Sequence, residues 1–495
     1  MSIINISNLT FGYDENEKNI FENVSLNLDT DWRLGFVGRN GRGKTTFLNL
    51  LMGQYSYKGN IACDLEFEYF PFEISNVNQK TVDVINSFDY QYNLWELERE
   101  MSLLDIPDET LHQEFSTLSK GEQTKIMLAF LFLKEDKFLL IDEPTNHLDA
   151  NGREKVANYL KSKKGFILVS HDRYFLDACV NHILSINKNN IEIQRGNFFS
   201  WKLNKDREDS FEIEKNAKLK KDIKRLEVAA KKTALWSNKI EDKKSKKSYG
   251  SKVPPMIDKG FVGAKAAKMM KKSKNLESRQ NNAIEEKSSL LKNIENTSSL
   301  KLHLEKYHSK DLLTLDNVSI YYDEKEICKN ISFTVERGDR VALVGKNGSG
   351  KSSILKLIMG ENLKTTGNFT KGTQMKISYV SQDTGFLKGN LSDFIIENAI
   401  DETLFKTILR KLDFSREHFS MKMENYSQGQ KKKVLLAKSL SEKAHLYIWD
   451  EPLNFIDIYS RIQLEEVLLA FVPTIIFVEH DKIFMENITN KIVDL

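Results

Sequence analysis

The chain has 495 residues, 40% of them hydrophobic, which is enough for two to four domains that each bury a core. No stretch approaches 18 consecutive apolar residues, and residues 1–15 lack the basic and apolar regions of a secretory leader. The sequence therefore predicts a cytoplasmic protein that does not insert into a membrane. Cys63, Cys179 and Cys328 stand far apart, which excludes a disulfide framework and a CxxC zinc site.

The net charge of +3 hides an uneven distribution. Residues 201–300 contain 26 Lys and Arg against 14 Asp and Glu, so the rest of the chain is acidic in sum. A basic segment between acidic ends indicates a polyanionic partner for the middle of the chain alone.

The first half contains a glycine-rich loop between an apolar strand and an amphipathic helix, in "GFVGRNGRGKTTFLNLL", residues 35–51. Glycines free backbone amides to wrap a polyphosphate, and the helix start adds the positive end of its dipole. Lys44 is then expected to reach the β and γ phosphates, and Thr45 to coordinate Mg²⁺. The predicted nucleotide-binding residues of this loop are Gly38, Asn40, Gly41, Gly43, Lys44, Thr45 and Thr46. Tyr13, upstream of the loop, is either a core aromatic or a side chain that stacks on adenine.

Two more apolar runs of the first half end in polar residues that suit ATP hydrolysis. "FLLIDEPTNHLD", residues 138–149, carries Asp142 and Glu143 to the edge of a sheet. The aspartate is expected to hold the Mg²⁺ shell, and the glutamate to accept a proton from the attacking water. His171 ends the next apolar run and is either structural or a contact of the γ-phosphate.

The middle of the chain is predicted to form a helical hairpin. Leu219, Ile223 and Leu226 recur at spacings of three and four, whereas Leu276, Ala283 and Leu290 recur at seven, as in a coiled coil. The helix period breaks in "SYGSKVPPMIDKG", residues 248–260, where glycines and adjacent prolines forbid a continuous helix. The hairpin therefore has a loop at its tip, at about residues 243–260.

The region around this tip is basic. Residues 231–275 carry 14 lysines against three acidic residues, with aromatic side chains interleaved. Lysines that neutralise phosphates and aromatics that stack on bases favour contact with folded RNA, and the alternative is a solvated spacer. The predicted RNA-contacting residues are Lys243, Lys244, Lys246, Lys247, Tyr249, Lys252, Lys265, Lys268, Lys271 and Lys272.

The second half repeats every landmark of the first in the same order, which indicates an internal duplication. "NVSIYYDE" at 317–324 matches "NLTFGYDE" at 8–15, and "ALVGKNGSGKSSILKLI" at 342–358 repeats the phosphate loop. "LYIWDEPLNFID" at 446–457 and "IFVEHDKIFM" at 476–485 repeat the acidic strand and the histidine strand. The residues predicted from this repeat are Tyr322, Gly345, Asn347, Gly348, Gly350, Lys351, Ser352 and Ser353 for nucleotide, Asp450 for Mg²⁺, and Glu451 and His480 for catalysis.

These motifs, with "LSKGEQ" at 118–123 and "YSQGQK" at 426–431, resemble the ATP-binding-cassette superfamily, and two cassettes in one chain resemble its ABC-F class. The resemblance implies an α/β fold with two tandem P-loop ATPase domains, residues 1–200 and 306–495, joined by a helical-hairpin linker, residues 201–305. It also implies that each ATP lies between one cassette's phosphate loop and the other's signature, within a monomer. The signature contacts implied are Ser119, Gly121, Glu122, Ser427 and Gly429, and Gln382 joins Thr45, Asp142, Ser352 and Asp450 around Mg²⁺.

Within that class, "DKGFVGAKAAKMMKKSK" at 258–274 resembles the Lsa-type antibiotic-resistance proteins. The resemblance implies binding to the bacterial ribosome, with the linker directed from the tRNA exit site toward the peptidyl-transferase centre. It implies protection against lincosamides, pleuromutilins and streptogramin A. Two alternatives stay open: a housekeeping factor that relieves stalled ribosomes, and the ATPase subunit of a membrane transporter.

The two halves depart from the family pattern in different ways. Phe72 stands where the family has a glutamine, and Gln430 and Lys431 replace the usual Glu and Gln of the signature. The first-loop site is therefore predicted to hydrolyse ATP more slowly than the second-loop site, where Gln382 can help to position Mg²⁺ and water. The alternative is that both sites hydrolyse alike, since both keep the glutamate and the histidine.

Overall fold

The computed structural model describes residues 2–13, 19–146, 148–187, 191–245, 300–322, 325–346 and 348–495, together with Lys271, Asn275, Ser278 and Arg279. Of the predicted tip loop at about 243–260, residues 243–245 are helical and belong to α7 (Phe198–Ser245), and the rest lies outside these residues. The predicted heptad positions Leu276, Ala283 and Leu290 lie outside them as well. The chain divides into one compact unit of Met1–Trp201 with Thr297–Leu495, and a second of Lys202–Asn296.

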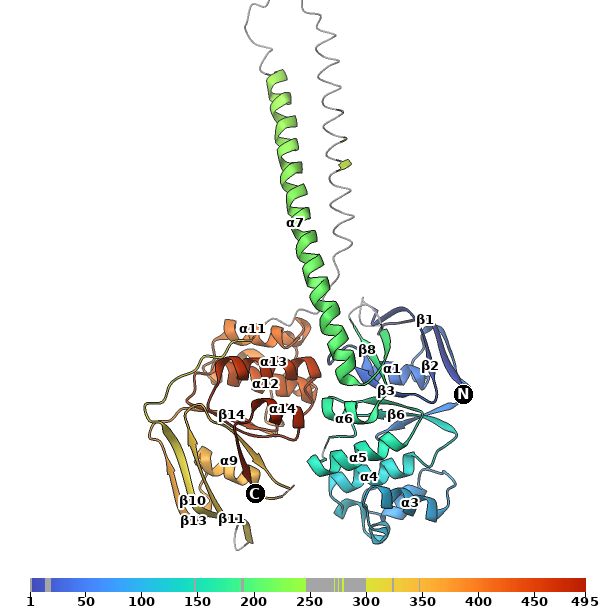
Figure 1. The fold of residues 1–495 in the computed structure, drawn as a ribbon, viewed down its shortest axis with the longest axis vertical. Helices are drawn as coiled ribbons and strands as arrows, with labels where there is room; N and C mark the ends of the chain where they lie inside the picture. The colour runs from blue at the N-terminus through green and yellow to red at the C-terminus, as the bar shows by residue number, and fades with distance from the viewer. Residues whose placement is uncertain are drawn as a thin grey trace, which may run out of the picture. The chain divides into compact units, whose positions relative to one another are not determined.

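The first cassette is built on a six-stranded sheet in the order β5-β6-β7-β3-β8-β9 (Figure 1). All its pairings are parallel except that of β8 with β9. The strands are β3 (Arg33–Val37), β5 (Glu66–Phe70), β6 (Lys137–Asp142), β7 (Phe166–Val169), β8 (His182–Ile186) and β9 (Ile191–Arg195). A smaller antiparallel sheet, β2-β1-β4, consists of β1 (Ile3–Phe11), β2 (Phe21–Asp29) and β4 (Lys58–Ala62).

Helices cover both faces of the six-stranded sheet, which explains why its inner strands read as continuous apolar runs. Successive residues of a strand point to opposite faces. Accordingly Phe138 and Leu140 of β6 join one hydrophobic cluster, and Leu139 and Ile141 join another. The helices are α1 (Lys44–Leu51), α2 (Thr81–Asn86), α3 (Leu94–Leu103), α4 (Lys120–Leu131), α5 (Ala150–Ser162) and α6 (Arg173–Cys179), with 3₁₀ turns η1 (Asp108–His112) and η2 (Phe115–Thr117).

The second cassette repeats this topology. Its parallel sheet runs β14-β15-β16-β12-β17, the counterpart of β5-β6-β7-β3-β8, and its small sheet runs β11-β10-β13. The strands are β10 (Asp311–Tyr322), β11 (Lys325–Glu336), β12 (Arg340–Val344), β13 (Lys364–Lys371), β14 (Ile377–Val380), β15 (Leu446–Asp450), β16 (Ile475–Val478) and β17 (Lys491–Asp494). The helices are α9 (Lys351–Met359), α10 (Leu391–Glu397), α11 (Glu402–Lys411), α12 (Gln428–Ser441), α13 (Ile458–Phe471) and α14 (Lys482–Ile488), with turns η4 (Glu417–Ser420) and η5 (Met423–Asn425). The α/β class with two tandem ATPase folds is therefore confirmed.

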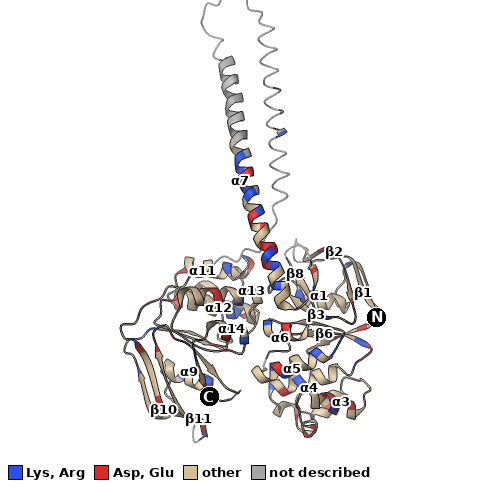
Figure 2. Cartoon of the chain, in the orientation of Figure 1, with Lys and Arg blue, Asp and Glu red and all other residues tan. Residues whose placement is uncertain are grey.

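The linker begins with a long helix, α7 (Phe198–Ser245), of 48 residues. Its first turn is fixed to the first cassette, because Phe198 and Trp201 are buried in that cassette's core. Acidic and basic side chains alternate along its described part, with i,i+4 pairs between Lys202 and Asp206 and between Lys205 and Asp209 (Figure 2). Residues 202–228 carry nine Lys and Arg against seven Asp and Glu, whereas residues 229–300 carry 17 against seven. The basic excess of the linker thus lies away from its base.

No helix in the described part of the chain has both the length and the apolar composition that crossing a bilayer requires.

A buried ion pair joins the two cassettes. The Arg173 guanidinium at the start of α6 donates to Glu465 of α13 and lies 3.5 Å from Asp481. All three side chains are buried. The duplication does not repeat this pair: the position of Arg173 is taken by Lys482, whose ammonium lies 4.4 Å from the ring centre of Tyr174. Arg173 of the first cassette therefore contacts the second through an ion pair, whereas the equivalent Lys482 contacts the first through an aromatic ring.

A second buried ion pair stabilises the interior of the second cassette. Lys433 Nζ donates to Asp457 Oδ2 at 2.9 Å and to the Leu412 carbonyl at 2.7 Å. Asp457 also caps α13 by accepting from the Ser460 amide at 3.0 Å. Burial alone would raise the pKa of Asp457, but the Lys433 ammonium outweighs burial and lowers that pKa below its ordinary value.

We predict that Lys433→Met destabilises the second cassette by about 3 to 5 kcal/mol, because it leaves the Asp457 carboxylate buried without its cation. Urea-induced unfolding measures the change. Adding Asp457→Asn should recover most of the loss, since asparagine still caps the helix. The matched control is Lys125→Met in the first cassette, where the half-buried ammonium donates to the Leu104 carbonyl at 3.4 Å and forms no ion pair within 4 Å among the described residues. A loss of about 1 kcal/mol or less is expected there, and equal losses for Lys433→Met and Lys125→Met would contradict the prediction.

Candidate nucleotide sites

In each cassette the predicted site residues converge because three neighbouring parallel strands end at the same edge of the sheet. The first phosphate loop, residues 38–45, follows β3, and Asp142 and Glu143 close β6. His171 follows β7, which lies between those two strands. Thr45 Oγ1 donates to Asp142 Oδ2 at 3.0 Å, and His171 Nε2 lies 3.5 Å from Glu143 Oε1.

The phosphate loops offer open backbone and a buried ammonium. Gly41 and Gly348 have φ of 79° and 83°, which favours glycine, and a Cβ at either would meet nothing within 4 Å. Lys44 Nζ donates to the Gly38 carbonyl at 2.8 Å and to the Arg39 carbonyl at 3.2 Å. Lys351 repeats this with the carbonyls of Gly345 and Lys346, both at 2.8 Å. Each loop can therefore wrap an anion, with a cation held beneath its backbone.

The acidic pair of each cassette has buried oxygens without partners. Among the described residues, Glu143 Oε1 and Asp450 Oδ1 are buried and make no hydrogen bond. Burial raises the pKa of Asp142 and Asp450, and burial together with Asp142 raises that of Glu143 to about 8. Unsatisfied carboxylate oxygens beside a phosphate loop fit a Mg²⁺ ion and its water shell.

Both glutamates that follow these aspartates have a strained backbone. Glu143 and Glu451 adopt φ of 51° and 46°, in the left-handed region that side chains other than glycine rarely occupy. Strain of this kind persists only where the surrounding structure imposes it, and it is concentrated at functional sites.

The histidines that follow β7 and β16 are held neutral. Burial and the Lys44 ammonium lower the pKa of His171 well below its ordinary value. Burial and the nearby Arg153 lower that of His480 to about 4. A neutral imidazole retains one acceptor nitrogen and one donor nitrogen.

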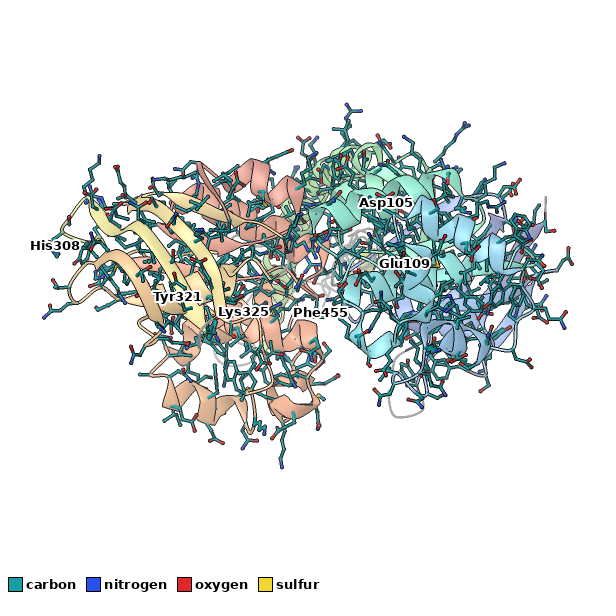
Figure 3. All side chains as sticks on the ribbon, turned by 90° about the horizontal axis from the view of Figure 1, so that it is seen from below. Asp105, Glu109, His308, Tyr321, Lys325 and Phe455 are labelled. Carbon is teal, nitrogen blue, oxygen red and sulfur yellow. The ribbon has the colours of Figure 1, made fainter. Side chains whose placement is uncertain are left out.

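At the first site, Asn40 links the phosphate loop to the other cassette. Its Oδ1 lies 2.9 Å from His171 Nε2, and its Nδ2 donates to the Phe455 carbonyl at 2.9 Å. Figure 3 shows Phe455 where the second cassette faces the first. Gly429 of the second signature lies at the same place, since a Cβ there would be 2.5 Å from the Phe455 oxygen and 3.1 Å from Asn40 Nδ2.

Two arginines of the first phosphate loop also face the second cassette. The Arg39 guanidinium lies 5.2 Å from the Tyr459 ring centre, and Arg42 lies 3.6 Å from Asp413. Sequence reasoning missed both residues because the loop motif leaves their positions free. The second phosphate loop has Lys346 and Ser349 instead.

The second site is a cavity of about 640 Å³ lined by both cassettes. It brings the first signature together with the second phosphate loop, which is the head-to-tail arrangement that the resemblance implied. The predicted residues that line it are Ser119, Gly121, Gly348, Gly350, Lys351, Ser352, Ser353, Gln382, Glu451 and His480. Lys120, Arg153 and Lys432 line it as well. Asn347 lies outside the described residues.

Glu451 is held from two sides in this cavity. Gln382 Nε2 donates to Glu451 Oε2 at 2.9 Å, and Asn454 Nδ2 donates to the same oxygen. Ser352 donates to Asp450, which opposes the effect of burial on the pKa of that carboxyl. Hydrogen bonds from Gln382 and Asn454 therefore orient Glu451, and one from Ser352 orients Asp450.

Lys432 is a buried cation that sequence reasoning missed. Its Nζ donates to the Ser381 carbonyl at 2.8 Å and to the Asp450 carbonyl at 3.0 Å. Burial lowers the pKa of Lys432 to about 8. It adds positive charge beside the second phosphate loop, whereas the first cassette has Thr124 at this position.

Both signatures begin a helix with the same cap. Ser119 Oγ accepts from the Glu122 amide at 3.2 Å, and Glu122 Oε2 accepts from the Ser119 amide at 2.9 Å. Ser427 and Gln430 form the same box at the start of α12. Gln430 therefore preserves the capping that glutamate provides. Glu122, predicted to contact nucleotide, is used by this cap and does not line the second cavity.

Phe72 does not occupy the first site. Its ring packs on Phe88 and Phe130, with centroids at 4.9 and 5.6 Å, in the core of the first cassette. Tyr69 reaches the site instead, and its hydroxyl donates to Asp142 Oδ2 at 3.1 Å. Burial and Asp142 raise the pKa of Tyr69, so it remains a donor.

The two aromatic residues predicted to stack on adenine lie at strand ends. The Tyr13 hydroxyl is 3.0 Å from Thr46 Oγ1 at the start of α1, and its ring packs edge-on against Phe11 and Tyr55. Tyr322 ends β10, is 41% exposed and does not line the second cavity.

Of the predicted RNA-contacting residues, Lys243 and Lys244 lie in α7, and Lys271 is helical and exposed. The others lie outside the described residues: Lys246, Lys247, Tyr249, Lys252, Lys265, Lys268 and Lys272.

Comparison with known proteins identifies the family twice along the chain. The family model described as "ABC transporter" matches residues 21–146 and 328–454. The chain is 30% identical to the ATP-binding protein Uup of Buchnera aphidicola over 520 residues, which cover 99% of this chain and 80% of the relative. It is 28% identical to the ribosome protection protein VmlR of Bacillus subtilis over 500 residues, which cover 99% and 86%.

Solved structures share the fold. An archaeal ribosome recycling factor, aABCE1, aligns with a TM-score of 0.63 and 16% identity over 98% of this chain and 87% of its own. The RNase-L inhibitor aligns with a TM-score of 0.61 and 16% identity over 99% and 87%. The chain therefore belongs to the ABC transporter family, as an ATP-hydrolysing member of the ABC-F group with two ATP-binding cassettes.

Proposed function

We propose that this ATPase binds the bacterial ribosome when ATP closes its cassettes and protects translation from lincosamide, pleuromutilin and streptogramin A antibiotics. Its linker is directed from the tRNA exit site toward the peptidyl-transferase centre, and ATP hydrolysis releases the protein. The observation that carries the proposal is the match to a ribosome protection protein over 99% of this chain, linker included.

The chemistry of the cassettes supports a switch driven by nucleotide. The cavity at the second site takes its lining from both cassettes, so a nucleotide there contacts both and favours their closed arrangement. Hydrolysis removes the γ-phosphate contacts that both cassettes share, which favours opening.

We assign the chemical step to the residues at the strand ends. Glu143 and Glu451 accept a proton from the attacking water, and the neutral imidazoles of His171 and His480 face the γ-phosphate. Lys44 and Lys351 face the β and γ phosphates. Thr45 with Asp142, and Ser352 with Asp450 and Gln382, would hold Mg²⁺, which would neutralise charge on the phosphate oxygens.

The composition of the linker supports an RNA partner. Residues 229–300 carry the basic excess, and lysines give salt-dependent binding to phosphates with little dependence on sequence. We assign the RNA contacts to Lys243, Lys244, Lys246, Lys247, Tyr249, Lys252, Lys265, Lys268, Lys271 and Lys272.

A housekeeping role in translation is the second candidate, because the chain is also 30% identical to Uup, whose name states only ATP binding and no protection, whereas it is 28% identical to VmlR. The two candidates differ in their dependence on a drug. A protection protein restores translation that a lincosamide has stopped, whereas a housekeeping factor restores drug-free translation on stalled ribosomes.

We predict that the second site supplies most of the ATP turnover. Gln382 orients Glu451 there, whereas the partly buried Phe72 packs against the core of the first cassette and offers Glu143 no corresponding donor. Removing a general base costs about 10²- to 10⁴-fold at its own site. Glu451→Gln should therefore abolish most of the steady-state turnover, and Glu143→Gln should leave most of it intact.

Single-turnover hydrolysis of radiolabelled ATP by both variants measures the two sites separately. Gln382→Ala is the companion variant and should slow the Glu143→Gln protein toward the rate of the Glu451→Gln protein. Equal residual rates in Glu143→Gln and Glu451→Gln would remove the asymmetry.

We predict ATP-dependent binding of the Glu143→Gln/Glu451→Gln protein to bacterial ribosomes, because it binds ATP without releasing it by hydrolysis. Co-sedimentation across a salt series measures the affinity. Replacing Lys243, Lys244, Lys246 and Lys247 by Gln should lower the slope of log affinity against log salt by roughly 3, at somewhat less than one per phosphate contact.

The control for this variant carries the same charge change nearer the base of the linker, at the exposed residues Lys218, Lys220, Lys221 and Lys224 of α7. It should bind as the parent does. Equal weakening by both sets would reject a specific contact near the tip, and ATP-independent pelleting would reject the switch. Failure to pellet, together with recovery in a membrane fraction, would instead favour the transporter subunit.

A further inference from the structure

Glu479 is a buried carboxylate that none of the roles assigned above uses. It follows β16 directly, precedes His480 and is 4% exposed. Its Oε1 accepts from the Leu453 amide at 2.6 Å, and its Oε2 accepts from the His480 amide at 3.0 Å. The Glu479 carboxylate thus connects the backbone of His480, at the second site, to the loop of residues 451–457, which begins at Glu451. Burial raises the pKa of Glu479 to about 7. When this carboxyl is ionised, its bonds to the two amides are about twice as strong as neutral ones.

The same loop, residues 451–457, is held from its other side by Arg461. This guanidinium donates to the carbonyls of Leu453 and Ile456, both at 2.9 Å. It also donates to Asp481 at 2.9 Å. The residues on both sides of His480 therefore fix one loop, Glu479 directly and Asp481 through Arg461.

The 451–457 loop reaches both nucleotide sites. Near its start, Asn454 donates to Glu451 in the second site. Further along, the Phe455 carbonyl accepts from Asn40 of the first phosphate loop at 2.9 Å, and Asn40 in turn contacts His171. Phe455 has φ of 63°, so its backbone is held in the left-handed region. A continuous series of contacts thus runs from His480 to His171.

The first cassette is built differently at this point. Ser170 replaces Glu479, and Thr145 replaces Leu453. The two hydroxyls lie 3.3 Å apart, and Ser170 Oγ accepts from the Asp172 amide at 3.1 Å. Arg153 still donates to the Leu148 carbonyl at 3.1 Å and to Asp172 at 2.9 Å. Among the described residues, the loop amide of the second cassette, that of Leu453, therefore bonds to a carboxylate. The equivalent place in the first cassette has two hydroxyls instead.

We propose that Glu479 is a positioning residue that couples the two nucleotide sites, by holding the 451–457 loop against His480 at the second site and against Asn40 at the first. The coupling rests on the proposed roles of Glu451 and His480. Two sites are coupled when both influence the arrangement of one structural element that lies between them. The loop meets this condition because it contributes contacts to both.

The test introduces Glu479→Ala into two backgrounds. Glu143→Gln reports turnover at the second site, and Glu451→Gln reports turnover at the first. Loss of the carboxylate should slow the second site by roughly tenfold or more, because a misplaced base loses the geometry that the reaction needs. It should also slow the first site, roughly threefold to tenfold, through the loop. The affinity for a fluorescent ATP analogue should stay within about threefold of the parent, since the phosphate loops are unchanged.

Hydrogen exchange of the peptide that contains residues 451–457 gives a readout independent of activity. Glu479→Ala should expose the Leu453 amide and accelerate its exchange. Ser170→Ala is the matched control: it should leave exchange in residues 451–457 and turnover at the second site unchanged. Glu479→Gln preserves the shape and one acceptor oxygen, so it should fold as the parent does and give intermediate rates at both sites.

The double variant Glu479→Ser/Leu453→Thr installs the first cassette's hydroxyl pair in the second. It should not restore turnover at either site, because the amide of residue 453 loses its carboxylate. Full restoration of turnover by Glu479→Ser/Leu453→Thr would overturn the coupling. A loss of turnover in Glu479→Ala that is confined to the second site would overturn it as well. Failure of the proposed catalytic roles gives a different result: the Glu143→Gln/Glu451→Gln protein would still hydrolyse ATP at the parent rate. Failure of ribosome binding would appear only in the co-sedimentation experiment and would leave both turnover rates unchanged.

Discussion

The second nucleotide site depends on one constraint: neither cassette alone supplies its lining. Ser119 and Gly121 of the first cassette share a cavity with Lys351 and Glu451 of the second. Contacts between cassettes therefore become part of the catalytic machinery. The buried Arg173–Glu465 ion pair and the Asn40–Phe455 hydrogen bond also join the two cassettes. Breaking a buried ion pair leaves an uncompensated charge, so such a pair favours one defined arrangement of the cassettes over slightly shifted ones.

Duplication preserved the backbone while the sites diverged. The strand order β14-β15-β16-β12-β17 repeats β5-β6-β7-β3-β8, so both phosphate loops, both acidic pairs and both histidines reach the same sheet edge. The divergence lies in side chains that the topology leaves free. Tyr69 bonds Asp142 in the first cassette, whereas Gln382 bonds Glu451 in the second. Ser170 and Glu479 differ at equivalent strand ends. Equal folds thus place unequal chemistry at two sites, and the two sites need not turn over together.

The sequence predicted those features that a local motif determines. The glycine spacing fixed both phosphate loops, and the apolar runs before Asp142 and Asp450 fixed the two acid-bearing strands. Contacts between residues far apart in the chain were not predictable in this way. Asn40 meets Phe455, and Arg42 meets Asp413, across the two cassettes, and no periodicity reports such pairs. Gln430 replaces the usual glutamate of the signature, but capping needs only an acceptor oxygen at that position, and glutamine has one. Phe72 was predicted to lack the chemistry of a glutamine, which remains a prediction. Only the fold shows that its ring packs against the core and that Tyr69 reaches Asp142 instead.

The base of α7 determines how a change in the cassettes reaches the linker. Phe198 and Trp201 are buried in the core of the first cassette, so the first turn of this helix moves with that cassette. A continuous helix of 48 residues is about 72 Å long, at 1.5 Å per residue. A rotation of about 5° at its base would move its far end by about 6 Å over that length. The oppositely charged pairs near the base add local helix stability, whereas the basic excess lies further along, where a polyanion would be met. Small rearrangements at the base of α7 are thereby converted into larger displacements along the helix.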